Sequence, residues 1–96
     1  MRTSFTRQEV VDITAEDLAT LKRDFQPIEK NPWAIRLAQI TEDLHDLASH
    51  SDPDASRLAE LEQRVATFLA EDKRNKGMTP YLYMIRSLKS DEKANI

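Results

Sequence analysis

One spacing in the chain matches a pattern that binds metal in other helical proteins. Glu42 and His45 stand three residues apart, and di-iron helical bundles use this Glu-x-x-His spacing twice, with two further glutamates. Here the motif occurs once. Helical spacing places Leu44 on an apolar seam and turns Glu42 and His45 outward. We therefore expect solvated surface residues, with no bound metal and no other cofactor.

The turn at residues 48–52 holds a second group of reactive types. His50, Asp52 and a serine, Ser49 or Ser51, could be written as a catalytic triad. The nucleophile, base and orienting acid of a triad converge from different elements, and chain neighbours rarely reach that geometry. We predict a plain turn and no catalytic residues, so the chain is not expected to be an enzyme.

Basic residues gather in the last third of the chain and are interspersed with aromatic residues. The candidate contacts among them are Lys73, Arg74, Lys76, Arg86 and Lys89, and the aromatic residues are Tyr81 and Tyr83. This combination could grip phosphates and stack bases, so a nucleic-acid-associated regulator is the alternative function. The cluster is small, however, and the formal net charge is −3. Cations that complement the negative end of a helix dipole are the simpler interpretation.

Composition excludes several other classes of function. The chain has no cysteine, which removes disulfides, thiolate nucleophiles and sulfur-ligated metal sites. Its single glycine, Gly77, cannot form a glycine-rich phosphate loop. The N-terminus lacks the apolar core of a signal peptide, and no stretch approaches the roughly 20 apolar residues of a membrane span. We expect a cytoplasmic protein without membrane contact.

The first quarter of the chain has two candidate helix starts. Thr6 and Glu9 have the form of a capping box, which favours a helix beginning there. The β-branched residues of 9–13 favour a short extended segment equally well. Whether residues 7–13 are helical or extended is left open. Thr14, followed by acidic residues, is the predicted N-cap of a helix over 15–25.

The strongest periodicity follows Asn31 and Pro32, which predict an N-cap and a first helical residue. Apolar residues then recur at helical spacing at Trp33, Leu37, Ile40, Leu44 and Leu47. Beyond a turn capped by Ser51 or Asp52, with Pro53 near the first position, a second seam comprises Leu58, Leu61, Val65 and Phe68. These seams predict an antiparallel helical hairpin of residues 32–50 and 53–74.

The remaining residues predict one more helix and a tail. Residues 73–77 resemble a helix C-terminus, with Gly77 as the left-handed residue. Thr79 and Pro80 predict a new start, and the helix would run to about residue 89. The predicted fold is all-α: a small bundle of three to four helices built on the central antiparallel hairpin. Residues 1–90 would form a single domain, and 91–96 a flexible tail.

The last predicted helix is apolar around most of its circumference. Leu82, Ile85 and Leu88 suit a core, whereas other residues are of types enriched at protein interfaces, namely Met78, Tyr81, Tyr83, Met84 and Arg86. We predict a non-catalytic protein–protein interaction module: an adaptor, small regulatory factor or accessory subunit. These residues would bind another protein or a second copy of the chain, giving a hetero-complex or a homodimer. The competing interpretation is that the tyrosines lie at the core edge with their hydroxyls in water.

Overall fold

The computed structural model describes residues 2–50 and 53–94, and these are almost entirely helical. The α-helices are α1 (Arg7–Asp24), α2 (Pro32–Ser49), α3 (Ala55–Glu71) and α4 (Thr79–Ala94). Two short 3-10 helices, η1 (Ile28–Lys30) and η2 (Lys73–Met78), precede α2 and α4. No strand occurs in the residues described, and the predicted all-α class is confirmed.

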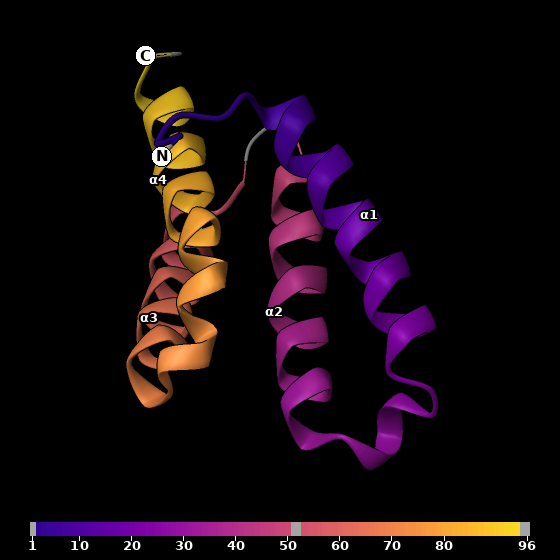
Figure 1. Ribbon diagram of the computed structural model, residues 1–96. Helices are drawn as coiled ribbons and strands as arrows, with labels where there is room; N and C mark the ends of the chain where they lie inside the picture. Colours follow the sequence, from indigo (N-terminus) through magenta and orange to yellow (C-terminus); the bar gives the residue numbers. More distant parts are fainter. Residues whose placement is uncertain (1, 51–52, 95–96) are drawn as a thin grey trace.

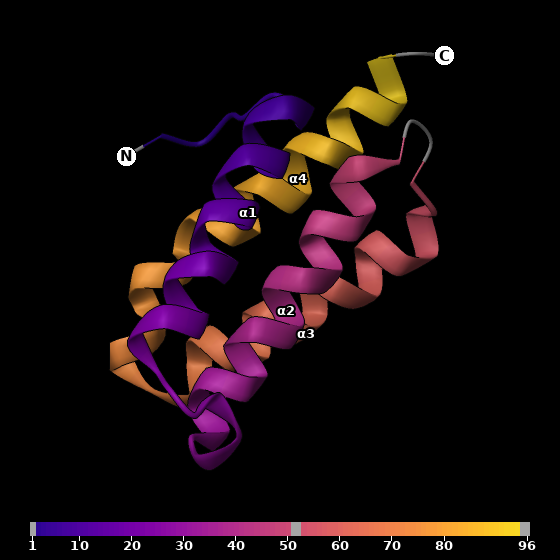
Figure 2. The ribbon, with the colours of Figure 1, turned by 90° about the vertical axis from the view of Figure 1, so that its right-hand side faces the viewer.

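The four helices form two antiparallel hairpins (Figure 1). Helix α1 packs most extensively on α2, and α3 on α4. Turning the molecule places the α1–α2 pair in front, with α3 and α4 behind it (Figure 2). Helices α2 and α3 run antiparallel and join the two pairs, whereas α1 and α4 contact each other only sparsely. The junction between the hairpins is therefore less tightly packed than either hairpin.

Helix α1 begins at the capping box and continues without interruption through Thr14. The Thr6 hydroxyl accepts a hydrogen bond from the Glu9 amide, and the Thr6 amide donates to the Glu9 carboxylate, both at 3.1 Å. Residues 7–13 are thus helical. The predicted N-cap at Thr14 is wrong, because this residue is buried within α1 and its hydroxyl donates to the Val10 carbonyl at 2.7 Å. Burial of Val10 and Thr14 outweighs the strand preference of β-branched residues.

Helix α2 begins as predicted, and α3 begins slightly later than expected. Asn31 accepts a hydrogen bond from the Ala34 amide at 3.1 Å, with Pro32 at the first helical position. Asp54 caps α3 by accepting from the Ser56 amide at 2.8 Å, so Pro53 precedes the helix. The predicted caps at positions 51 and 52 lie outside the described residues.

The segment between α3 and α4 differs from the prediction. Helix α3 ends at Glu71, because Asp72 caps η2 by accepting from the Arg74 amide at 2.9 Å. Gly77 does not adopt a left-handed conformation. Thr79 has helical angles, φ −51° and ψ −37°, so it belongs to α4 instead of capping it. Helix α4 then reaches Ala94, beyond the predicted end near residue 89.

The core lies along the predicted seams. Every seam residue of α3 is buried, and so is every seam residue of α2 except Trp33, which is half-buried. Helix α1 adds Val10 and Leu21, and α4 adds Tyr81, Met84, Ile85 and Leu88. No described helix has both the length and the apolar character needed to cross a membrane.

Candidate binding site at the junction of the two hairpins

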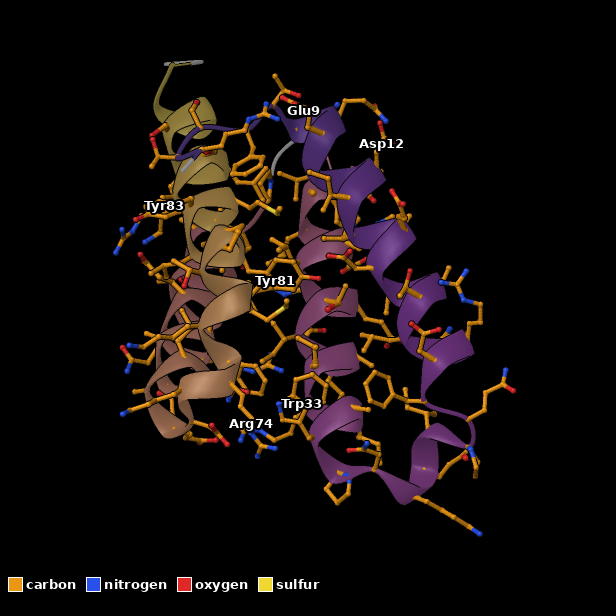
Figure 3. The ribbon with its side chains drawn as sticks, viewed as in Figure 1. Glu9, Asp12, Trp33, Arg74, Tyr81 and Tyr83 are labelled. Carbon is orange, nitrogen blue, oxygen red and sulfur yellow. The ribbon has the colours of Figure 1, made fainter. Side chains whose placement is uncertain are left out.

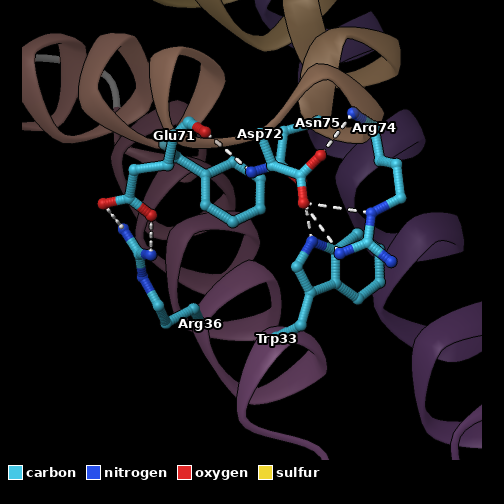
Figure 4. Close-up of polar contacts among 7 residues, drawn as sticks. Trp33, Arg36, Glu71, Asp72, Arg74 and Asn75 are labelled. Carbon is cyan, nitrogen blue, oxygen red and sulfur yellow. Dashed lines mark hydrogen bonds and ion pairs between the residues drawn. The ribbon is translucent and has the colours of Figure 1, made fainter.

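Trp33 lies where the first turn of α2 meets η2 of the second hairpin. Its indole Nε1–H donates to Asn75 Oδ1 at 2.7 Å, and the buried Asn75 donates from Nδ2 to the Phe68 carbonyl at 2.7 Å (Figure 4). The Trp33 ring is also 5.7 Å from the Phe25 ring and 6.4 Å from the Phe68 ring, between centroids. The indole is therefore fixed by a polar contact and by aromatic neighbours on both hairpins.

Two hollows share Trp33 as a lining residue. The first has a volume of about 380 Å³ and is lined by Phe25, Asn31, Trp33 and Arg74. The second, of about 200 Å³, is lined by Asp17, Thr20, Leu21, Trp33, Leu37, Met78 and Tyr81. The lining of the second hollow comes from both hairpins, at the side where α1 and α4 barely touch. Figure 3 shows Tyr81 between α4 and α2, with Trp33 and Arg74 towards the η2 end of the molecule.

Tyr81 provides the polar edge of the second hollow. Its hydroxyl donates to Asp17 Oδ2 at 2.6 Å and lies 3.1 Å from the Thr41 hydroxyl. Burial raises the pKa of Tyr81 well above its usual value, and the hydrogen bond to the Asp17 carboxylate raises it further. Tyr81 is therefore a neutral hydrogen-bond donor at physiological pH.

The predicted partner-contact residues do not share one surface. Tyr81 and Met84 are only 3% and 2% exposed, so Met84 belongs to the core and is not accessible, contrary to our expectation. Met78 and Tyr81 line the second hollow. The half-buried Tyr83 and exposed Arg86 lie on another side of α4, with the guanidinium 5.9 Å from the centroid of the Tyr83 ring.

Three of the five predicted nucleic-acid contacts are already paired with carboxylates. Arg74 binds Asp72 at 2.7 Å, and Glu62 binds both Lys89 at 2.5 Å and Arg86 at 3.2 Å. The remaining two, Lys73 and Lys76, are exposed. Phosphate binding by the paired cations would compete with these internal carboxylates, so the nucleic-acid alternative gains no support from this arrangement.

The predicted Glu42–His45 surface pair is placed differently by the long α1. Glu42 is exposed, but His45 is half-buried, with Nδ1 at 3.0 Å from the Thr14 hydroxyl and 3.2 Å from the Val11 carbonyl. The predicted outward orientation of His45 is thus wrong, because α1 covers this part of α2. Within the part of the chain that the structure describes, no three potential metal ligands come together.

The turn around His50 shows no triad geometry in its described part. The exposed His50 lies 3.6 Å from Asp46, and its carbonyl accepts from Arg7 at 3.0 Å. The Ser49 hydroxyl donates to the His45 carbonyl at 2.7 Å. Positions 51 and 52 lie outside the described residues.

Sequence reasoning missed Asp17 and the hollow beside it. The signal was present in the capping box: a helix begun at residue 7 places Asp17 three residues after the buried Thr14 and four before the buried Leu21, on the inward face. Comparison with known protein families, curated proteins and solved structures found no match.

Proposed function

We propose that this chain is a non-catalytic protein-binding module, acting as an adaptor, small regulatory factor or accessory subunit. Its contact surface comprises the two hollows beside Trp33, at the junction of the hairpins. The observation that carries the proposal is a half-buried tryptophan shared by two largely apolar hollows. Tryptophan in such a setting is typical of the residues that dominate binding energy at protein interfaces.

The composition of the second hollow favours recognition over chemistry. Apolar side chains of Leu21, Leu37 and Met78 surround two ionisable groups, Asp17 and Tyr81. The raised pKa of Tyr81 keeps its hydroxyl protonated, and that hydroxyl already donates to Asp17. An apolar hollow with a few fixed polar groups is suited to bury and orient a side chain of a partner.

The partner is another protein or a second copy of this chain. A hollow of about 200 Å³ accommodates one large side chain, so a protein segment would insert an anchor residue and cover the surrounding surface. Tyr83 and Arg86 remain a separate predicted contact on the other side of α4. They would extend the interface only if the partner wraps around that helix.

Site-specific photo-crosslinking in cells of the native organism tests this proposal. A benzoylphenylalanine at Thr20, which lines the second hollow, should yield an adduct of one defined mass. The same group at Ala66, an exposed residue of α3, is the matched control and should not yield that adduct. The adduct's partner is then purified and its affinity measured. No Thr20-specific adduct, or equal adducts from both positions, would contradict the proposal.

A further inference from the structure

Asp17 differs from the other half-buried carboxylates of the described chain. The half-buried carboxylates are Glu9, Asp17, Asp43, Glu62 and Asp72. Four have an arginine or lysine partner: Glu9 pairs with Arg2, Asp43 with Arg64 at 2.6 Å, Glu62 with Lys89 at 2.5 Å, and Asp72 with Arg74 at 2.7 Å. Among the side chains that the structure describes, the Tyr81 hydroxyl is the only hydrogen-bond or ion-pair partner of Asp17.

A carboxylate partly removed from water is costly unless a cation or several donors compensate its charge. The Tyr81 hydroxyl binds Oδ2 of Asp17, and no other described side chain donates to this carboxylate. The charge of Asp17 is therefore less compensated than that of the four paired carboxylates. A cation arriving from outside the chain would fill the role that arginine or lysine fills elsewhere.

The residues around Asp17 indicate which kind of cation the hollow would bind. The hollow that Asp17 lines is otherwise bounded mainly by Leu21, Trp33, Leu37 and Met78. Lysine and arginine carry a charged head on an aliphatic stem, and the stem gains from contact with apolar surface. A small hydrated cation would gain nothing from these walls. The indole of Trp33 adds a surface on which a cationic head or its stem is favoured.

The one arginine or lysine that lines either hollow, Arg74, does not oppose such a ligand. Arg74 lines only the other hollow, beyond Trp33, and its Nε and Nη2 donate to Asp72 at 3.0 and 2.7 Å. Its charge is thereby compensated within η2. The formal net charge of −3 also favours the approach of a basic segment.

We infer that the second hollow binds a lysine or arginine side chain from a basic segment of a partner protein. The aliphatic stem lies against Leu37, Met78 and Trp33, and the cationic head pairs with Asp17. This inference rests on the proposed protein-binding function and adds the chemistry of the anchor residue.

The single tryptophan of the chain reports on this site directly. The probes are the capped peptide Ala-Leu-Lys-Leu-Ala and its analogue with norleucine for lysine, which keeps the stem and removes the ammonium group. Titration at low ionic strength follows the Trp33 Nε1–H resonance and the indole fluorescence. The lysine peptide should give a saturable shift with an affinity about tenfold higher than that of the norleucine peptide, a difference of about 1.4 kcal/mol.

Two matched variants isolate the carboxylate. Asp17→Asn keeps an oxygen that accepts the Tyr81 hydroxyl, so the fold should persist, as circular dichroism will check. It should lower the affinity for the lysine peptide about tenfold. Asp12→Asn is the control, because Asp12 lies on the outer side of the same helix (Figure 3). There its Oδ1 accepts a hydrogen bond from Gln8 Nε2 at 2.9 Å. It should leave the affinity unchanged.

Three outcomes would overturn the inference: no Trp33 shift with the lysine peptide, equal affinity for both peptides, or unchanged affinity in Asp17→Asn. Equal affinity would show that the hollow takes apolar side chains, and the proposed protein-binding function would stand. Failure of the Thr20 crosslink would instead contradict the function itself, so the two failures are distinguishable.

Discussion

The Tyr81 hydroxyl donates a hydrogen bond of 2.6 Å to the Asp17 carboxylate and so connects α4 with α1. The same hydroxyl lies 3.1 Å from the Thr41 hydroxyl of α2. One side chain of the second hairpin thus contacts both helices of the first. Because α1 and α4 pack only sparsely, this phenol is an important polar link between the hairpins.

Tyr81→Phe should destabilise the protein by about 1–3 kcal/mol, because Asp17 and Thr41 lose a hydrogen-bond partner at a buried site. The ring, and hence its packing, is retained. Urea unfolding followed by circular dichroism measures the change. Tyr83→Phe is the control, and it should stay within about 0.5 kcal/mol, because Tyr83 is half-exposed. Equal losses in the two variants would contradict a linking role for the Tyr81 hydroxyl.

Alkaline pH should remove the contribution of Tyr81 to stability. The pKa of Tyr81 is raised in the folded state by burial and by Asp17, above an unfolded value of about 10. The contribution is therefore fully present below pH ~10 and is lost as the pH rises towards the folded pKa. In urea titrations from neutral to alkaline pH, the stability advantage of the wild type over Tyr81→Phe should shrink above pH ~10. A constant advantage would count against the raised pKa.

Acid should open the capping box at the start of α1. Hydrogen bonds from Arg2 and from the Thr6 amide lower the pKa of Glu9 to about 2. The stabilisation is present above the unfolded pKa of about 4.3 and is lost as pH falls through the folded pKa. The Thr6 amide resonance should therefore titrate with a midpoint near 2. Arg2→Ala removes the largest cause of the lowered Glu9 pKa, so the midpoint should rise. An unchanged midpoint would refute the role of Arg2.

The parts of the fold that depend on local chemistry were predictable from the sequence. Asn31 and Pro32 fix the start of α2 through a cap and a ring that suits the first turn. The seams of α2 and α3 repeat at helical spacing, so their buried faces follow. The predicted cap at Thr14 is wrong because a threonine that caps a helix and one buried inside a helix look alike in sequence. Only packing against α2 distinguishes them.

The candidate site depended on contacts that the sequence does not display. Trp33 was predicted on the seam, but its exposure and its partner Asn75, 42 residues away, follow from where η2 packs. Likewise, Asp17 and Tyr81 are 64 residues apart and meet only because the hairpins pack together. The prediction of Met84 as a partner contact is wrong, because methionine suits both a core and an interface and only the packing of α4 places it in the core.

Separate serine substitutions at positions 83 and 84 should have unequal effects. Met84 is 2% exposed, so Met84→Ser removes core volume and buries a hydroxyl, at a cost of about 2–5 kcal/mol. Tyr83→Ser should cost far less and leave the helical content intact. Thermal unfolding of the two variants compares them. Similar melting temperatures would contradict the assignment of Met84 to the core.

Replacing Asn75 should affect both stability and the geometry of the Trp33 site. Asn75 is 2% exposed and satisfies the Trp33 Nε1–H and the Phe68 carbonyl at once, each at 2.7 Å. In Asn75→Ala both groups lose their partner, at about 1–3 kcal/mol for each group that water does not reach. The freed indole should shift its fluorescence emission.

Lys73→Ala, at an exposed position of the same short helix, is the control. It should change the stability by no more than ~0.5 kcal/mol and shift the emission only slightly. If Asn75→Ala left the emission unchanged, contacts with the rings of Phe25 and Phe68 would suffice to hold the indole. The hollows would then owe their shape to aromatic packing instead of to the buried amide.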